Sequence, residues 1–271
     1  MSSKTKKNKY EIDMCSGSIM DKLIAFSLPL MLSGILQLMF NAVDIVVVGK
    51  FSGSEALAAV GSTSALINVF TNLFIGVSLG TNVLAARFYA SGREKEMSET
   101  VHTSLTFALI SGIVMSFVGL FCSRGALELM ATPEDVIGQA ALYMKIYFLG
   151  MPFFMLYNYG AAVLRAVGDT KRPLYFLVVS GILNAGLNMF LVIVFHMGVE
   201  GVAIATVISQ VASCTYALRF LFSDRIPIKI TFRGYDWNVM KRVIQIGMTP
   251  FIIIAMDNVL IIALNTVIQR L

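Results

Sequence analysis

The chain has 271 residues, of which 57% are hydrophobic and only 14% are charged, and its formal net charge is +5. Soluble domains carry about 25% charged residues, so these side chains are too few to coat a soluble surface. The same figures exclude a disordered, collagen-like or disulfide-stapled chain and indicate a polytopic membrane protein. We attribute the positive charge to membrane topology and expect no nucleic-acid partner.

Taken in chain order, six apolar stretches are predicted to cross the bilayer as helices, because a core about 30 Å thick needs about 20 apolar residues of helix. A seventh stretch covers residues 243–268. The fold class expected is therefore all-α, a polytopic transmembrane helical bundle. The six complete spans cover approximately residues 23–48, 56–86, 101–122, 136–163, 174–195 and 202–222.

The distribution of basic residues predicts the orientation of the chain. Seventeen of the 21 Lys and Arg residues fall in the N-terminal tail and in alternate loops. Because cytoplasmic loops are rich in Lys and Arg, we expect a multi-pass protein of the cytoplasmic (inner) membrane with a cytoplasmic N-terminus. The expected divisions are a basic tail (1–22), a six-helix lobe (23–222), a cytoplasmic linker (223–242) and the first helix of a second lobe (243–271).

A weak internal repeat links the first and seventh spans. Pro29 and Pro250 each lie early in an apolar span, and each is preceded by a small residue within three positions. Duplicated six-helix halves are common in secondary transporters. On that interpretation the chain is expected to be truncated, so transport would need a second lobe or a partner chain; a chance proline match is the alternative.

Two carboxylates, Asp44 and Asp257, fall within the predicted spans. A charge at the bilayer centre costs at least about 2.5–3.5 kcal/mol, so such residues usually face a cavity and serve a function. Gln37 and Asn41 precede Asp44 at helical spacing, so the three side chains share one face. Asp257 is a weaker candidate, because function and plain buried polarity explain it equally well.

Counting residues from the ends of the spans places polar residues of distant spans at about the same depth in the bilayer as Asp44. At about 1.5 Å of rise per residue, Asn188 and Thr206 lie at a similar depth in the outer half, and Asn184 lies one turn deeper. One carboxylate with several neutral oxygens suits Na⁺, or the carboxylate takes up H⁺. The alternative is that the uncharged residues only join helices by hydrogen bonds.

Polar and aromatic residues of other spans predict a substrate cavity. Aromatic rings and methionines suit bulky apolar cations, although packing against lipid or core explains them as well. Gly76 and Gly80 form a close-packing motif that says nothing about substrate. The residues expected to line the cavity are Gln37, Asn41, Asn68, Asn72, Tyr147, Met151, Gln210 and Asp257.

The sequence contains no motif of a known enzyme class. It has no P-loop, no HExxH, no GxSxG and no dinucleotide fingerprint, and its three cysteines are widely spaced. We therefore expect neither an enzyme nor a bound cofactor. The only small inorganic partner expected is a coupling ion, Na⁺ or H⁺.

The chain resembles the multidrug and toxic compound extrusion (MATE) transporters. The resemblance rests on Leu-Pro-Leu at 28–30, Phe-Asn-Ala-Val-Asp at 40–44, Gly-Asp-Thr-Lys-Arg-Pro at 168–173 and the Asn184 and Thr206 segments. It implies twelve helices in two lobes and cation-coupled efflux of organic cations or drugs. It also implies that Asp44, Asn184, Asn188 and Thr206 form the cation site, where Na⁺ would bind if Na⁺ is the coupling ion.

One position departs from the family pattern and leaves the coupling ion open. Many members with a cation site have Asp where this chain has Asn188. The site then holds one carboxylate, which weakens Na⁺ binding or favours H⁺ coupling. The alternatives to an efflux antiporter are a lipid-linked oligosaccharide flippase of the same superfamily, which would need cationic residues in its cavity, and a non-transporting membrane fragment or subunit.

Overall fold

The computed structural model describes residues 12, 18–130, 132–223 and 235–268, and the side chains of these residues apart from 65 and 257–268. The described residues form helices and no strand, which confirms the predicted all-α class. In chain order the helices are α1 (Ile19–Phe51), α2 (Gly53–Ala90), α3 (Glu94–Leu129), α4 (Glu134–Leu149), α5 (Met151–Ala166), α6 (Lys171–Met189), the π-helix η1 (Phe190–Val194), α7 (Val199–Leu221) and α8 (Trp237–Ile268).

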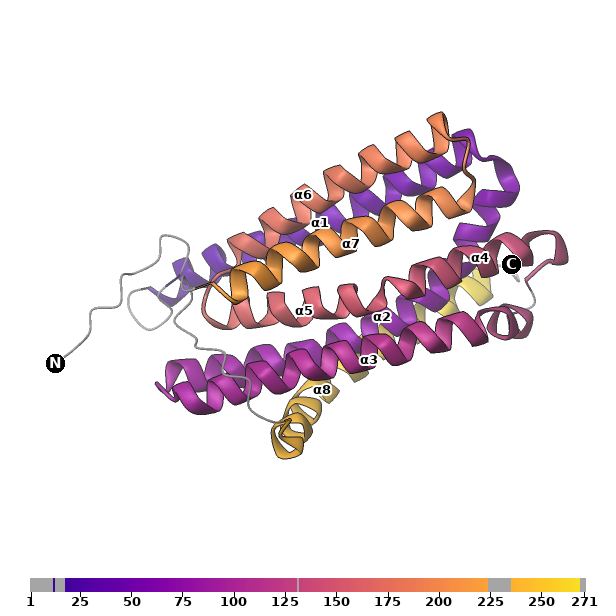
Figure 1. The fold of residues 1–271 in the computed structure, drawn as a ribbon. Helices are drawn as coiled ribbons and strands as arrows, with labels where there is room; N and C mark the ends of the chain where they lie inside the picture. The colour runs from indigo at the N-terminus through magenta and orange to yellow at the C-terminus, as the bar shows by residue number, and fades with distance from the viewer. Residues whose placement is uncertain (1–11, 13–17, 131, 224–234, 269–271) are drawn as a thin grey trace.

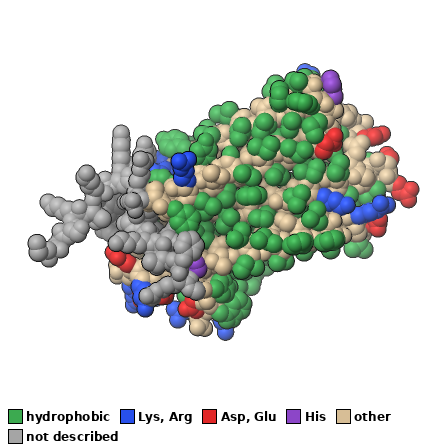
Figure 2. All heavy atoms as spheres, viewed as in Figure 1, with side chains coloured by type: hydrophobic (Ala, Val, Ile, Leu, Met, Phe, Trp, Pro, Cys, Tyr) green, Lys and Arg blue, Asp and Glu red, His purple; other side chains and the backbone are tan. Residues whose placement is uncertain are grey.

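The helices have the length and hydropathy of membrane spans. Six qualify by themselves within the described residues, and α4 with α5 qualifies as a bent seventh. Hydrophobic side chains cover the middle of the molecular surface, and most charged side chains lie toward its two ends (Figure 2). A belt of this kind matches a bilayer core, so the chain is a multi-pass membrane protein.

The fourth span differs from the single helix predicted over 136–163, because it breaks at Gly150 and bends by 47°. Pro152 follows the break and has no backbone N–H for the carbonyl one turn earlier. The Ser116 hydroxyl lies 2.7 Å from that carbonyl, on Phe148, and donates a hydrogen bond to it. The neighbouring helix α3 therefore satisfies the group that the proline leaves unpaired.

The helices form two groups joined by the bent span. Helices α1, α6 and α7 lie side by side, and α5 packs against α7 on one side and against α2 and α3 on the other (Figure 1). The antiparallel connections place the start of α1, the α2–α3 turn and the α5–α6 turn at the same end. Most of the Lys and Arg residues that the structure describes lie at this end.

Helix α8 crosses α2 with its backbone in direct contact. A Cβ atom added at Gly80 would lie 2.1 Å from the carbonyl oxygen of Val243, and one at Gly247 would lie 2.8 Å from the Cα of Val77. A Cβ atom at Gly76 would lie 2.9 Å from the Cα of Phe251. The predicted close-packing motif is therefore confirmed, and its partner is α8.

Candidate functional site

A cavity of about 250 Å³ lies between the two groups of helices. Its walls come from α1, α2, the α4–α5 pair, α6 and α7. No Lys or Arg is among the described residues that line it. The lining residues that the sequence singled out for substrate are Gln37, Asn41, Asn68, Asn72, Tyr147 and Gln210.

A hydrogen-bonded chain of polar side chains crosses one wall of this cavity. The Asn188 amide on α6 donates to the carboxylate of Asp44 on α1 and, at 3.3 Å, to the Asn184 carbonyl oxygen. The Asn184 amide donates in turn to the Thr206 hydroxyl on α7, at 3.3 Å. The four residues predicted for the cation site are thus brought together from three helices, and their role as cation ligands stays a prediction.

Asn188 carries an unsatisfied acceptor beside the carboxylate. Its side chain is fully buried, and both of its amide contacts to neighbours use the nitrogen. Its Oδ1 atom has no hydrogen-bond partner among the described residues. Leaving a buried acceptor unpaired costs about 1–3 kcal/mol, so this oxygen is available to a cation or to a proton donor.

The oxygens of this cluster suit a hard cation. Asp44 offers a carboxylate, Asn184 and Asn188 offer amide oxygens, and Thr206 offers a hydroxyl, which are ligands that hard cations prefer. No group of three or more His, Cys, Asp or Glu side chains with metal-binding geometry occurs among the described residues. The donor set therefore fits Na⁺, or H⁺ on the carboxylate, better than a transition metal.

Aromatic rings form the rest of the cavity wall. Phe40, Tyr147, Phe154 and Tyr157 line it from α1, α4 and α5. The Tyr157 hydroxyl donates to the carbonyl oxygen of Pro173 at 3.0 Å, which fixes its ring. Ring faces next to a carboxylate form a surface that attracts bulky cations.

Glycine makes room for one of these rings. A Cβ atom added at Gly181 on α6 would lie 1.9 Å from the ring of Phe40 on α1. The absence of a side chain at this position lets the ring lie directly against the α6 backbone. The glycine thus sets the distance between α1 and α6 next to the Asp44 cluster.

Two residues predicted for the cavity are not placed in its lining. Met151 is fully buried and is not among the lining residues, because α5 begins with its backbone against α3: a Cβ at Gly112 would lie 3.2 Å from the Met151 carbonyl oxygen. Asp257 lies on α8, and its side chain falls outside the described part of the structure.

The structure also adds small polar residues that the sequence interpretation missed. Ser209 and Ser213 follow Thr206 on α7 at helical spacing, and Ser180 lies one turn before Asn184 on α6. Their positions at three- and four-residue intervals from predicted site residues were the signal that could have identified them. Asn158 on α5 also lines the cavity.

Comparison with known proteins identifies relatives over most of the chain. The MatE family model matches residues 29–190. The probable multidrug resistance proteins YoeA and YpnP of Bacillus subtilis (strain 168) are 31% and 30% identical to the chain. These alignments cover 92% and 87% of this chain and 55% and 53% of the relatives, so the chain spans about half the length of the curated relatives it matches.

Solved structures share the fold. A multidrug resistance MATE family transporter of the MOP superfamily, in an outward-facing conformation, superposes with a TM-score of 0.89 at 24% identity. The superposition covers 97% of this chain and 58% of that transporter. The helical arrangement, including the position of α8 against α2, is therefore one that a solved transporter also has.

Proposed function

The chain belongs to the MatE family, and we propose that it forms one six-helix lobe, together with the first helix of a second, of a cation-coupled multidrug efflux antiporter in the cytoplasmic membrane. The N-terminus lies in the cytoplasm in this proposal, as the distribution of Lys and Arg favours. Its relatives carry names of multidrug resistance proteins, which points to a transporter and away from an enzyme. A second lobe is needed, because alternating access requires two bodies that move against each other.

One observation carries this proposal: the unpaired Oδ1 of Asn188 lies in the same buried cluster as the Asp44 carboxylate. A coupling ion entering from outside would gain a charged ligand and a pre-positioned neutral one. Its binding would compete for the carboxylate with the Asn188 amide and so alter the contact between α1 and α6. The cluster is thus a site where ion binding can change helix packing.

The drug in this proposal is an organic cation held in the central cavity. The aromatic rings of Tyr147 and Tyr157 supply faces for it, and Asp44 supplies the only carboxylate among the described lining residues. A coupling ion at Asp44 removes that negative charge from the cavity. Drug and ion therefore bind with opposing preference, which is the linkage that antiport requires.

The chemistry of Asp44 allows both Na⁺ and H⁺ as coupling ion. Four oxygen-bearing side chains favour Na⁺, whereas a single carboxylate without a second negative ligand favours H⁺. Separate ion gradients distinguish these two cases. We propose no bound cofactor for either.

The test is drug efflux from proteoliposomes that contain the full-length protein, driven by a Na⁺ or an H⁺ gradient. We expect Asp44→Asn to lower gradient-driven efflux by at least about fivefold, because coupling free energies of 1–3 kcal/mol correspond to about 5–150-fold. Asp135→Asn is the matched control, since Asp135 is an exposed carboxylate outside the cavity. Unchanged efflux and unchanged ion dependence in Asp44→Asn would contradict the proposal.

The two rival functions make different predictions. A flippase for a lipid-linked diphosphate sugar needs positive charge in its cavity, and none of the described lining residues is Lys or Arg. A non-transporting subunit would give no gradient-driven efflux in any reconstitution. Efflux that disappears in Asp44→Asn but persists in Asp135→Asn would contradict both rivals.

A further inference from the structure

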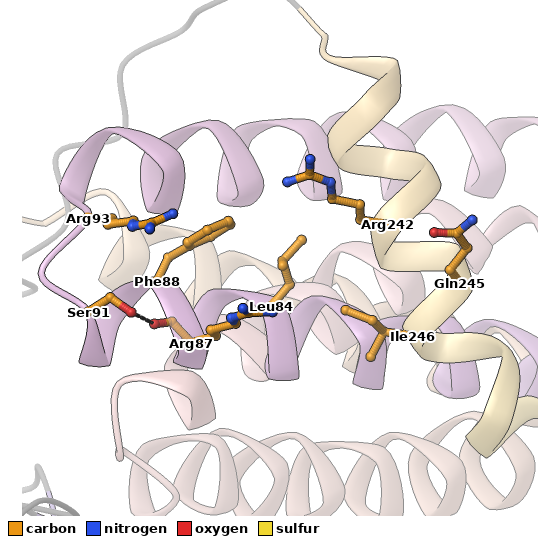
Figure 3. A pocket seen from close by; sticks show the side chains of 8 residues that line it. All are labelled: Leu84, Arg87, Phe88, Ser91, Arg93, Arg242, Gln245 and Ile246. Atoms are coloured by element: carbon orange, nitrogen blue, oxygen red, sulfur yellow. Dashed lines mark hydrogen bonds between the residues drawn. The ribbon is translucent and has the colours of Figure 1, made fainter.

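A second pocket, of about 320 Å³, lies between α2, the α2–α3 turn and α8, at the basic end of the molecule. Its charged residues are Arg87, Arg93 and Arg242, and no carboxylate is among the described residues that line it. Figure 3 shows Arg93 and Arg242 extending toward one another from opposite sides of the pocket, above the ring of Phe88. Positive charges from α2, the α2–α3 turn and α8 therefore surround this one pocket.

Within the described part of the chain, no carboxylate pairs with these arginines, and the carbonyls at the end of α2 already accept other hydrogen bonds. Basic side chains often bond to the carbonyls at a helix C-terminus. At the end of α2 those carbonyls accept hydrogen bonds from backbone amides instead: Ser91 N–H donates to Arg87 at 3.1 Å and Arg93 N–H donates to Phe88 at 3.0 Å. No ion pair joins Arg87, Arg93 or Arg242 to a carboxylate within the described residues.

The floor of the pocket is apolar. Leu84 and Phe88 are buried and Ile246 is half-buried, while the arginines form an exposed rim. Guanidinium groups bind phosphate through two parallel hydrogen bonds, and like charges around one space are relieved by an anion between them. If these arginines were only hydrated by solvent, neither a pocket between them nor an apolar floor beneath them would be needed.

We propose that this pocket binds a phosphate group, held by Arg87 and Arg93 on one side and Arg242 on the other. The apolar floor suits the glycerol and first acyl carbons of an anionic phospholipid whose headgroup phosphate lies at the rim. A soluble phosphate would use the same guanidinium groups without the floor. The bound phosphate would link α2 and the α2–α3 turn to α8, the first helix of the predicted second lobe.

The test measures binding to the full-length protein in detergent, which does not depend on transport and so can fail separately from the proposed antiport. The probes are dihexanoyl phosphatidylglycerol, dihexanoyl phosphatidylcholine and inorganic phosphate, observed by native mass spectrometry and by the shift in melting temperature. We expect phosphatidylglycerol to bind and Arg242→Gln or Arg93→Gln to weaken it about tenfold, because hydrogen bonds to charged groups are among the strongest. Arg242→Lys, which keeps the charge but loses the paired donors, should weaken it less.

Lys241→Gln is the matched control, because Lys241 is an exposed neighbour of Arg242 that does not line the pocket. Tighter binding of phosphatidylglycerol than of inorganic phosphate supports a lipid headgroup, and binding of inorganic phosphate that is as tight and is weakened by Arg242→Gln supports a soluble phosphate. Binding that is equal for phosphatidylcholine, equal in all variants, or equally weakened by Lys241→Gln would overturn the proposal. All of the substituted side chains are exposed, so the folded fraction, checked by circular dichroism, should be unchanged.

Discussion

The Asn188 amide hydrogen-bonds to the Asp44 carboxylate across 144 positions of sequence, and the Asn188 carbonyl oxygen next to it has no partner among the described residues. Substituting Asn188 by Asp would add a second negative ligand without changing the shape of the side chain. Because affinity for a hard cation rises with the number of charged ligands, we expect Asn188→Asp to lower the Na⁺ concentration needed for half-maximal stabilisation by about tenfold. The Na⁺-dependent shift in melting temperature measures this effect.

The matched control places a carboxylate elsewhere in the same cavity. Asn72 lines the cavity from α2, away from the α1–α6 contact. Asn72→Asp should therefore leave the Na⁺ response close to that of the parent protein. An equal gain in both variants would mean that the cavity responds to total charge rather than to the Asp44 cluster.

Gly181 and Phe40 set the spacing of α1 and α6. A methyl group at Gly181 would overlap the Phe40 ring, so we expect Gly181→Ala to lower stability by about 1–3 kcal/mol and to reduce efflux. Phe40→Leu in the same protein should restore part of the stability. Gly186→Ala on the same helix should be neutral, because the added carbon would meet no described residue within 4 Å outside its own helical turn. Equal effects of the two alanines would rule out the steric explanation.

The contact between α2 and α8 leaves no room for an additional carbon atom at Gly80. At Gly80 the obstacle is the Val243 backbone carbonyl, which no side-chain rotation can remove. We expect Gly80→Ala to displace α8 and to lower the melting temperature, although alanine favours a helix by about 1 kcal/mol over glycine. Trp237, the single tryptophan of the chain, lies at the start of α8, so its fluorescence reports this movement.

Gly61→Ala provides the comparison for that experiment. Gly61 lies on α2 as well, but an added Cβ would meet no described residue within 4 Å outside its own helical turn. Its melting temperature should stay the same or rise slightly. An unchanged Trp237 signal in Gly80→Ala would show that α8 does not depend on this crossing.

The turn between α5 and α6 contains a buried carboxyl that predicts a pH effect. Asp169 is 1% exposed and accepts a hydrogen bond from the Arg172 guanidinium at 2.7 Å. Burial raises the pKa of Asp169 above its ordinary value of 3.8, against the opposing effect of Arg172. The folded protein therefore holds this proton more tightly than the unfolded chain, and that stability is lost as the pH rises from 3.8 through the raised pKa.

Asp169→Asn removes the titrating group from this turn. We expect the melting temperature of this variant to fall less than that of the parent protein as the pH rises across the acidic range. Asp135→Asn, at an exposed position, should follow the parent curve. Identical pH profiles for Asp169→Asn and the parent protein would show that Asp169 does not contribute to the pH dependence of stability.

The spans could be predicted from the sequence because a long apolar run can satisfy its own backbone hydrogen bonds in a bilayer only as a helix. Sequence reasoning also placed Asp44, Asn188 and Thr206 at one depth, with Asn184 one turn deeper, since helical rise is constant and the turns mark each span's ends. It missed the bend at Gly150, because the apolar run continues through the break without a polar interruption. The orientation of Met151 depends on that bend, so its position in the core could not be predicted from spacing alone.

The break between α4 and α5 has a mechanical consequence. Pro152 offers no N–H to the Phe148 carbonyl, which accepts a hydrogen bond from Ser116 instead, so the span lacks one regular helical hydrogen bond at its bend. Tyr147 lies before the break and Tyr157 after it, and both face the cavity. A change of a few degrees in the angle at Gly150 would therefore alter the distance between these two rings. Both helical segments would stay intact, so the fourth span can change the width of the cavity without unfolding.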